Sequence, residues 1–186
     1  MKKFPVALGL AISLSAPLAA HAVKLLVDSP DIKPARQIPE VHVFNGFGCE
    51  GTNLSPALVW KHPPRGTRSF AVTVYDPDAP TGSGWWHWVV FNLPADTRGL
   101  EAGASDPASG KMPAGAVQGR TDFGKPGWGG PCPPKGDRPH RYVFTVHALK
   151  IDKIELDENA PAAMVGFMIN ANELARAAIT ARHSRK

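Results

Sequence analysis

Cysteine and long apolar runs are scarce in this sequence of 186 residues, and their scarcity argues against several classes of protein. The two cysteines are too few for a multi-disulfide scaffold or a four-thiolate zinc site. The apolar run at 6–14 is well short of the roughly 18 residues that a membrane-spanning helix needs. Internal repeats, heptads and the H-E-x-x-H and G-x-S-x-G motifs are absent as well.

Glycine and proline, by contrast, are abundant, with 18 and 19 residues. Both residue types favour turns, so this composition argues against a helical bundle. Apolar residues make up 43% of the chain and charged residues 20%, which is typical of a folded globular protein rather than a disordered one. The composition therefore predicts a globular protein that is rich in turns.

The first 22 residues have the pattern of an export signal. Two lysines precede the apolar run 6–14, a proline follows it, and Ala20-His21-Ala22 is an A-x-A cleavage motif. We expect a signal peptide (1–22) that is cleaved after Ala22, which leaves one domain (23–186) in the periplasm or outside the cell. A short N-terminal anchor is the alternative. Removing this leader lowers the formal net charge from +5 to +3, too little to favour a nucleic-acid partner.

Export changes what is expected of Cys49 and Cys132, because disulfides form in oxidising compartments. Each cysteine lies beside glycines, in Gly-Phe-Gly-Cys and Gly-Gly-Pro-Cys. We expect one disulfide between them, which would stabilise the fold by roughly 4 to 5 kcal/mol in the chain-entropy model. Two buried free thiols are the alternative.

Seven short segments alternate apolar and polar residues or are rich in β-branched residues, as strands are. They are residues 23–27, 41–44, 58–61, 68–75, 87–93, 116–121 and 140–149. Helical periodicity occurs only late, at 162–168 and 172–178, and Pro161 suits the start of the first of these helices. The pattern predicts a mainly β protein, a sandwich of antiparallel sheets with a few short helices.

Two loops that are rich in glycine and proline, 76–86 and 123–139, lie next to the candidate functional residues. These candidates are Asp76, Asp78, His87, His140 and Tyr142. His140 and Tyr142 are two residues apart on a predicted strand, which places both on one face. Imidazole and phenol groups donate hydrogen bonds, and carboxylates can hold imidazoles in a donating tautomer. Together these groups predict a pocket for a small anion, whereas structural roles are expected for His42, His62, His147 and His183.

The motifs resemble those of the phosphatidylethanolamine-binding, or Raf-kinase-inhibitor-like, family, especially its bacterial branch. The resemblance rests on Asp-Pro-Asp-Ala-Pro at 76–80, His87, Pro-Lys-Gly at 134–136 and His-Arg-Tyr at 140–142. It implies a sandwich of two antiparallel sheets, in which the five candidates line a pocket for phosphate-type head groups. It also implies a cis peptide bond before Pro80. The implied pocket rim consists of Pro80, Trp85, Pro134 and Gly136.

The leading hypothesis is an exported, non-catalytic binding protein, without cofactor or metal, that holds a small phosphorylated or carboxylated ligand. Binding is expected to be weak and to tighten at lower pH, because a protonated imidazole holds an anion more strongly. A modulator of a protein partner through the same pocket is the second hypothesis, with Trp85, Trp86 and Trp128 as a contact rim. Packing of the pocket loops is the simpler interpretation of these tryptophans.

A hydrolase or metal-dependent enzyme is the third hypothesis, since carboxylates and imidazoles serve in acid–base catalysis and metal binding. The missing nucleophile and metal motifs place it last. The resemblance also implies a homodimer.

Overall fold

The structure, a computed structural model, describes residues 24–186. The predicted leader of residues 1–22 and its cleavage site lie outside this part of the chain. Within the described part, the fold is mainly β, with antiparallel sheets, one α-helix and two 3-10 turns, which confirms the predicted fold class. No helix of these residues is both long and apolar enough to cross a membrane.

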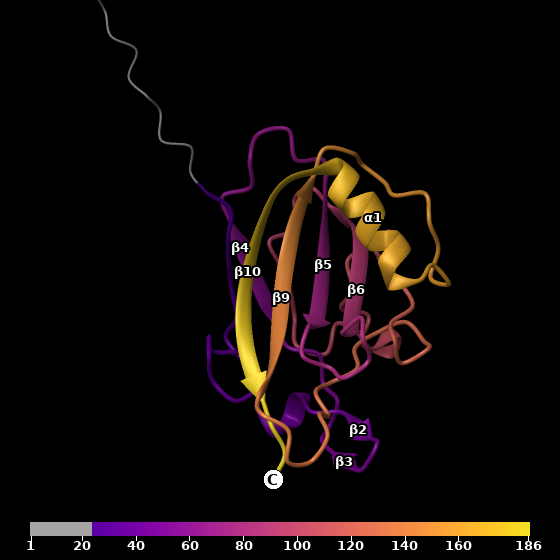
Figure 1. The fold of residues 1–186 in the computed structure, drawn as a ribbon. Coiled ribbons are helices and arrows are strands. Elements are labelled where there is room, and N and C mark those ends of the chain that lie inside the picture. The colour runs from indigo at the N-terminus through magenta and orange to yellow at the C-terminus, as the bar shows by residue number, and fades with distance from the viewer. Residues whose placement is uncertain (1–23) are drawn as a thin grey trace, which may run out of the picture.

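Five antiparallel strands form the central sheet (Figure 1). In spatial order they are β10 (Glu173–His183), β9 (His140–Leu149), β5 (Ser69–Asp76), β6 (Trp85–Pro94) and β8 (Val117–Gln118). Strands β5, β6 and β9 are buried over most of their length, because both faces of the sheet are covered.

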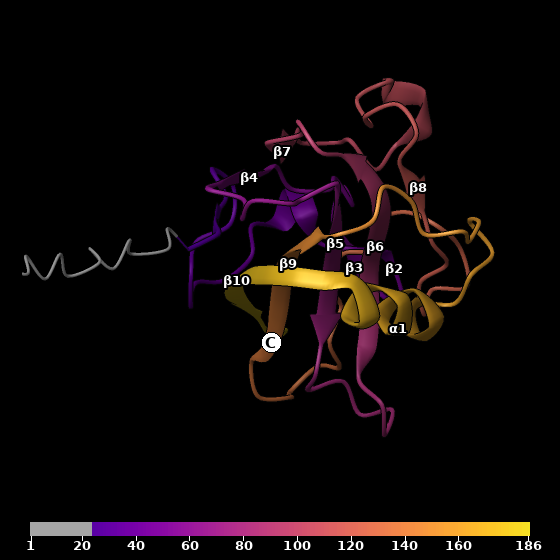
Figure 2. The ribbon, with the colours of Figure 1, turned by 90° about the horizontal axis from the view of Figure 1, so that it is seen from above.

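A second sheet and a helix cover the two faces of the central sheet (Figure 2). They are β1 (Leu26–Asp28), β4 (Leu58–Lys61) and β7 (Gly99–Leu100) on one face, and α1 (Ala162–Asn172) on the other. One group of buried side chains, including Trp60, Trp88 and Phe144, fills the space between the sheets. Another, including Phe91 and Val165, lies between the central sheet and α1. The remaining elements are the turns η1 (Glu40–His42) and η2 (Pro107–Ser109) and the hairpin β2 (Asn45–Gly46) and β3 (Cys49–Glu50).

Most predicted strands are found where the sequence placed them. The segments 58–61 and 140–149 coincide with β4 and β9, and 68–75 and 87–93 differ from β5 and β6 by one or two residues. The segment 116–121 is reduced to the short strand β8. The first helix begins after Pro161, as predicted.

The predicted helix at 172–178 is wrong, because α1 ends at Asn172 and residues 173–178 belong to strand β10. Its alanines favour a helix locally. Burial nevertheless alternates along β10 and the strand pairs with β9 over its whole length, so a neighbour distant in sequence overrides the local preference. The predicted strand at 41–44 is also wrong. The His42 N–H donates to the Pro39 carbonyl at 3.0 Å and closes a 3-10 turn there instead.

Gly130 lies where the loop 123–139 crosses the backbone of residues 42–44. A Cβ at this position would lie 2.1 Å from the His42 carbonyl oxygen and 2.5 Å from the Phe44 amide nitrogen. We therefore expect Gly130→Ala to lower the free energy of unfolding by about 1 to 3 kcal/mol in urea denaturation, as overpacking does.

Gly166→Ala is the control for this substitution. Gly166 lies inside α1 with nothing within 4 Å of the added Cβ, so we expect the free energy of unfolding to rise by up to about 1 kcal/mol. Equal effects of the two substitutions would contradict the packing argument.

Candidate functional site

A cavity of about 160 Å³ opens at the end of the central sheet, where β5 ends and β6 and β9 begin. We call it the sheet-end cavity. Of the predicted anion-binding residues, those that line it are Asp76, His87, His140 and Tyr142. Of the predicted rim residues, those that line it are Pro80, Trp85 and Pro134. Antiparallel pairing of β5 with β9 brings these segments together, whereas Asp78 and Gly136 are not lining residues.

Asp76 and His140 form a buried pair in this cavity. Each side chain is 3% exposed, and Nδ1 of His140 donates to Oδ2 of Asp76 at 2.8 Å. The other oxygen of Asp76 accepts from the Asp78 N–H at 2.8 Å. Because a carboxylate only accepts, Nδ1 of His140 carries a proton, and Nε2 is the ring atom left for a ligand. Nε2 lies 3.3 Å from Oδ2 of the partly exposed Asp137, which would compete with an anionic ligand.

A β-bulge turns His87 toward the cavity. Val74 pairs with Trp88 and Tyr75 pairs with Trp86, which leaves His87 as the extra residue of β6. Bulges commonly redirect side chains beside functional sites. As a result, Trp86 lines a cleft next to α1, while His87 and Trp88 face the other side of the sheet.

The backbone determines which nitrogen of His87 carries the proton. Nδ1 lies 2.6 Å from the Gly129 carbonyl oxygen, which only accepts, so the proton is on Nδ1. Burial lowers the pKa of His87 to about 4, despite the opposing effects of the Gly129 carbonyl and the Asp76 charge. At neutral pH, Nε2 of His87 is therefore a hydrogen-bond acceptor. The expectation that both imidazoles donate to a ligand is corrected for His87.

Tyr142 supplies a hydroxyl donor. Its side chain is buried, and its ring meets that of His87 edge-on, with 5.0 Å between the centroids. Burial, and then the Asp76 carboxylate, raise the pKa of Tyr142 well above its usual range, so the hydroxyl stays protonated. Tyr142 and His140 line the same cavity, as their spacing of two predicts.

Asp78 is held outside the cavity by two arginines, contrary to its predicted place. Oδ2 accepts from the N–H and the Nε of Arg141, at 2.9 and 2.8 Å, and Oδ1 accepts from Arg138 and Arg141, each at 2.9 Å. The Arg141 hydrogen bonds, against the desolvation of the carboxyl, lower the pKa of Asp78 well below its usual range. Asp78 thus ties the loop 76–86 to the start of β9. Arginines lie on both sides of His140 in the sequence, and they were the signal from which this place of Asp78 could have been predicted.

Gly136 and the bond before Pro80 also differ from expectation. The Gly136 N–H donates to the Arg185 carbonyl at 3.2 Å, which places this residue against the C-terminal segment rather than the cavity. The peptide bond before Pro80 is trans, as are all peptide bonds of residues 24–186. The Thr81 N–H donates to the Ala79 carbonyl at 2.8 Å, and this closes a tight turn around the proline.

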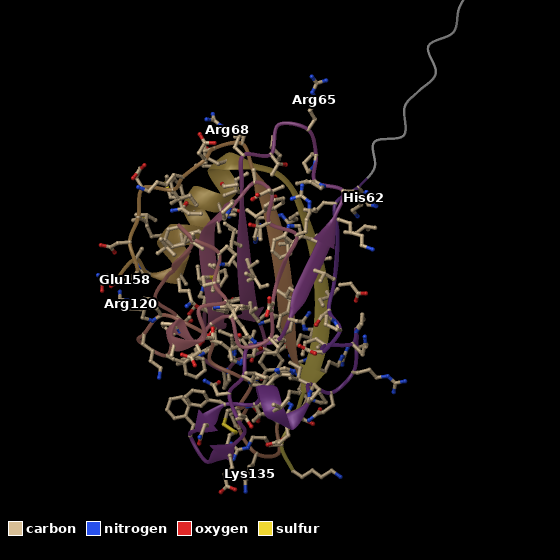
Figure 3. The ribbon with its side chains drawn as sticks, turned by 180° about the vertical axis from the view of Figure 1, so that it is seen from behind. His62, Arg65, Arg68, Arg120, Lys135 and Glu158 are labelled. Carbon is tan, nitrogen blue, oxygen red and sulfur yellow. A yellow bond between two sulfur atoms is a disulfide. The ribbon has the colours of Figure 1, made fainter. Side chains whose placement is uncertain are left out.

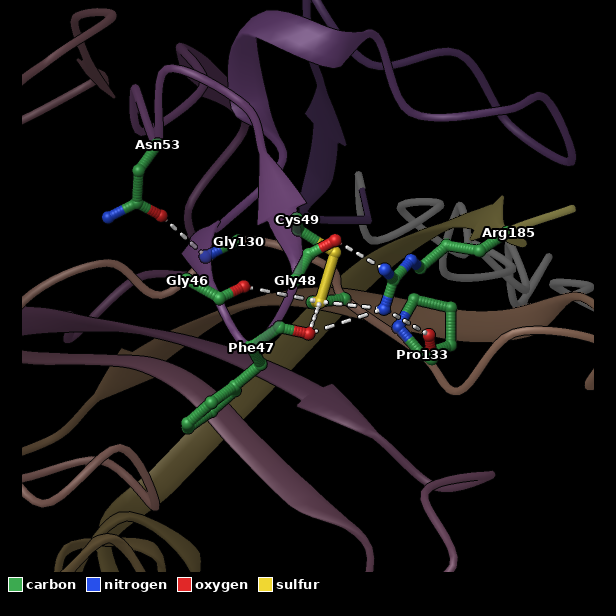
Figure 4. Close-up of a disulfide and its surroundings, with 9 residues drawn as sticks. Gly46, Phe47, Gly48, Cys49, Asn53, Gly130, Pro133 and Arg185 are labelled. Carbon is green, nitrogen blue, oxygen red and sulfur yellow. Dashed lines mark hydrogen bonds between the residues drawn. A yellow bond between two sulfur atoms is a disulfide. The ribbon is translucent and has the colours of Figure 1, made fainter.

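The predicted disulfide between Cys49 and Cys132 is present (Figure 4). It joins the hairpin β2–β3 to the loop 123–139, and Cys132 itself lines the cavity. Arg185 reinforces this link, because Nη1 donates to the Pro133 carbonyl at 3.3 Å and Nη2 to the Gly48 carbonyl. The hairpin is therefore held against the cavity wall at two points.

Sequence reasoning missed an aromatic wall of the cavity that includes Phe47 and Phe123. The two rings are stacked with centroids 6.0 Å apart, and Trp85 meets Phe123 edge-on at 5.4 Å. Phe47 comes from the hairpin and is 70% exposed. The available signal was its position two residues before Cys49, whose predicted partner Cys132 lies in the loop 123–139.

Within residues 24–186, no three His, Cys, Asp or Glu side chains converge in a way that could hold a metal ion. The imidazoles of the cavity are instead held by a carboxylate and a backbone carbonyl. The site can donate hydrogen bonds to one small polar group and accept hydrogen bonds from it, and an apolar wall lies beside that group.

These features define a class of protein: a sandwich of antiparallel sheets with a small polar cavity at the end of its central sheet. Over residues 28–184 the sequence matches the phosphatidylethanolamine-binding protein family, and the chain belongs to this family.

Similar proteins include UPF0098 proteins YbcL and YbhB of Escherichia coli (strain K12), both 57% identical to this chain. The alignments cover 87% of this chain and 88% of YbcL, and 84% of this chain and 98% of YbhB. The crystal structure of E. coli YbcL, described as a new member of the mammalian PEBP family, has a TM-score of 0.86 and 56% identity. The match covers 88% of this chain and 100% of the YbcL chain in that crystal structure.

Proposed function

We propose that this chain is an exported protein whose sheet-end cavity binds the phosphate group of a small ligand without catalysing a reaction there. The observation that carries this proposal is the convergence of His87, His140 and Tyr142 on one small cavity with an aromatic wall. Family membership supports it, since the family is named for binding a phospholipid with a phosphate-containing head group. The leader pattern of residues 1–22 supports export.

The acceptor character of His87 favours a phosphomonoester over a carboxylate. A phosphomonoester has its second pKa at about 6, and below that pH it keeps one P–O–H group that can donate to Nε2 of His87. A carboxylate with a pKa near 4 has no such proton at neutral pH. The Tyr142 hydroxyl would then donate to another of the phosphate oxygens. Binding therefore tightens as the ligand becomes a monoanion, without protonation of His87.

Calorimetric titration of residues 23–186 with phosphoethanolamine tests this proposal. We expect weak binding that is about tenfold tighter near pH 5 than near pH 8, because the monoanion of the ligand dominates only at the lower pH. His140→Ala should weaken binding about tenfold or more, because it removes the imidazole that Asp76 holds in the cavity.

His62→Ala is the matched control, because His62 is exposed and lies at the far end of the molecule from Lys135 and the disulfide (Figure 3). It should bind as the unchanged chain does. Absence of binding at both pH values, or full binding by His140→Ala, would refute the proposal.

Phe47 favours a second candidate function, in which the cavity receives a phosphorylated residue of a protein partner. The side chain is 70% exposed and lines the cavity, on a hairpin that the disulfide and Arg185 hold in place. A rigid aromatic side chain beside a pocket is typical of residues that dominate protein contacts. Phosphoethanolamine would compete with such a partner.

A further inference from the structure

A second cleft lies on the opposite face of the central sheet, between the strands and α1. Its volume is about 270 Å³, and it shares no lining residue with the sheet-end cavity. Thr73 of β5 and His147 of β9 line it, together with Gly166 and Ile169 of α1. We call it the helix-side cleft. The proposed phosphate binding uses none of its residues.

A hydroxyl, an imidazole and a carboxylate form a hydrogen-bonded chain in this cleft. Oγ1 of Thr73 lies 3.0 Å from Nε2 of His147, and Nδ1 of His147 lies 2.6 Å from Oε2 of Glu173. Glu173 only accepts, so Nδ1 carries the proton of the neutral ring and Nε2 accepts from the Thr73 hydroxyl. A nucleophile within hydrogen-bond reach of a base, which a third group orients, is the arrangement found in covalent catalysis.

Glu173 is fixed as an ionised carboxylate. Its other oxygen accepts from Nε of Arg176 at 2.7 Å. Burial raises the pKa of Glu173, but the hydrogen bonds from His147 and Arg176 outweigh this effect and bring the pKa below its usual range. The carboxylate is therefore available to stabilise a positive charge on His147.

The cleft has room and polar groups for a substrate beside the hydrogen-bonded residues Thr73, His147 and Glu173. Gly166 lies inside α1, where glycine is about 1 kcal/mol less favourable than alanine, yet nothing lies within 4 Å of its absent Cβ. Its lack of a side chain thus keeps the cleft open. Asn170 and Arg176 line the cleft with N–H donors, and Trp86 supplies an apolar wall.

We propose that the helix-side cleft is an esterase site for small apolar esters, with Thr73 as nucleophile and His147 as general base. Oγ1 of Thr73 attacks the ester carbonyl carbon while its proton passes to Nε2 of His147. That proton then goes to the alcohol oxygen as the C–O bond to the leaving alcohol breaks. In the second step, water attacks the carbonyl carbon of the acyl-threonine and gives a proton to Nε2 of His147. The bond between this carbon and Oγ1 then breaks, and Oγ1 recovers the proton from His147. The donors of Asn170 and Arg176 stabilise the carbonyl oxygen in both steps.

Hydrolysis of p-nitrophenyl butyrate by the purified chain of residues 23–186 tests this proposal. We expect Thr73→Val to lower kcat/KM about 100-fold or more, because it keeps the side-chain volume and removes the hydroxyl. Thr73→Ser should retain activity. Glu173→Gln, which changes the positioning of His147, should lower kcat while KM stays within about twofold.

Thr180→Val is the matched control, because Thr180 is a threonine of the same sheet, on β10, that does not line the cleft. It should hydrolyse the ester at the rate of the unchanged chain. An alkyl fluorophosphonate, whose fluoride leaves as Oγ1 bonds to phosphorus, should label Thr73 in peptide mass mapping. No hydrolysis, an equal rate in a folded Thr73→Val, or labelling elsewhere would overturn the proposal.

Discussion

Replacing Cys49 and Cys132 together by serine is expected to lower the free energy of unfolding by about 4 to 5 kcal/mol in the chain-entropy model. The two residues are 83 apart in sequence, so their bond removes much of the conformational freedom of the unfolded chain. The loss should also loosen the hairpin β2–β3, which brings Phe47 to the sheet-end cavity. The hydrogen bonds of Arg185 and the stacking of Phe47 on Phe123 then still link this hairpin to the loop 123–139.

Guanidinium denaturation of the oxidised chain and the double-serine chain measures this difference. A thiol reductant should bring the unchanged chain close to the stability of the double-serine chain and leave the latter unaffected. A difference below about 1 kcal/mol between the two oxidised samples would contradict the proposed contribution of the disulfide.

Replacing Asp76 by alanine is expected to abolish phosphoethanolamine binding and to destabilise the fold by about 3 to 5 kcal/mol. The carboxylate accepts from His140 Nδ1 and from the Asp78 N–H, and hydrogen bonds to a charged group contribute about 1.5 to 3 kcal/mol each. Without it, the buried imidazole loses the partner that fixes its proton on Nδ1. The donor geometry of the cavity is then lost together with the hydrogen bonds.

Asp78→Ala is the comparison for this variant, because its carboxylate bonds Arg138 and Arg141 outside the cavity. Binding by Asp78→Ala should stay within about threefold of the unchanged chain, since its arginine partners are exposed and become solvated. Calorimetric titration and urea denaturation of both variants separate the two carboxylates. Equal loss of binding in both variants would mean that Asp78 takes part in the site, as the sequence alone predicts.

The strands were predictable where burial leaves a periodic trace in the sequence. Segment 140–149 is apolar along most of its length because it lies between β10 and β5 in a sheet that is covered on both faces. Segment 173–183 has the same strand character, but its small alanines also suit a helix. Only the pairing with β9 decides between the two, and that pairing involves residues about thirty positions earlier in the chain.

In the candidate site, too, some features were predictable from the sequence and others depend on the tertiary structure. Asp76, His87, His140 and Tyr142 were identifiable because each lies at a strand end beside a loop that is rich in glycine and proline. The bulge that turns His87 to the cavity, and the arginines that withdraw Asp78, depend on how β6 and β9 meet β5. The chain Thr73–His147–Glu173 joins three separate segments, so no local motif announces it.

By itself, the sequence determined a mainly β fold, a single pair of cysteines to be joined, and the residue types of a small polar cavity. Only the tertiary structure decided what each of these groups does. The Gly129 carbonyl, 42 residues from His87, makes that imidazole an acceptor, and Arg141, 63 residues from Asp78, takes that carboxylate out of the cavity. The physical reason is that protonation and hydrogen-bond roles depend on burial and on partner atoms, which folding brings together from distant segments.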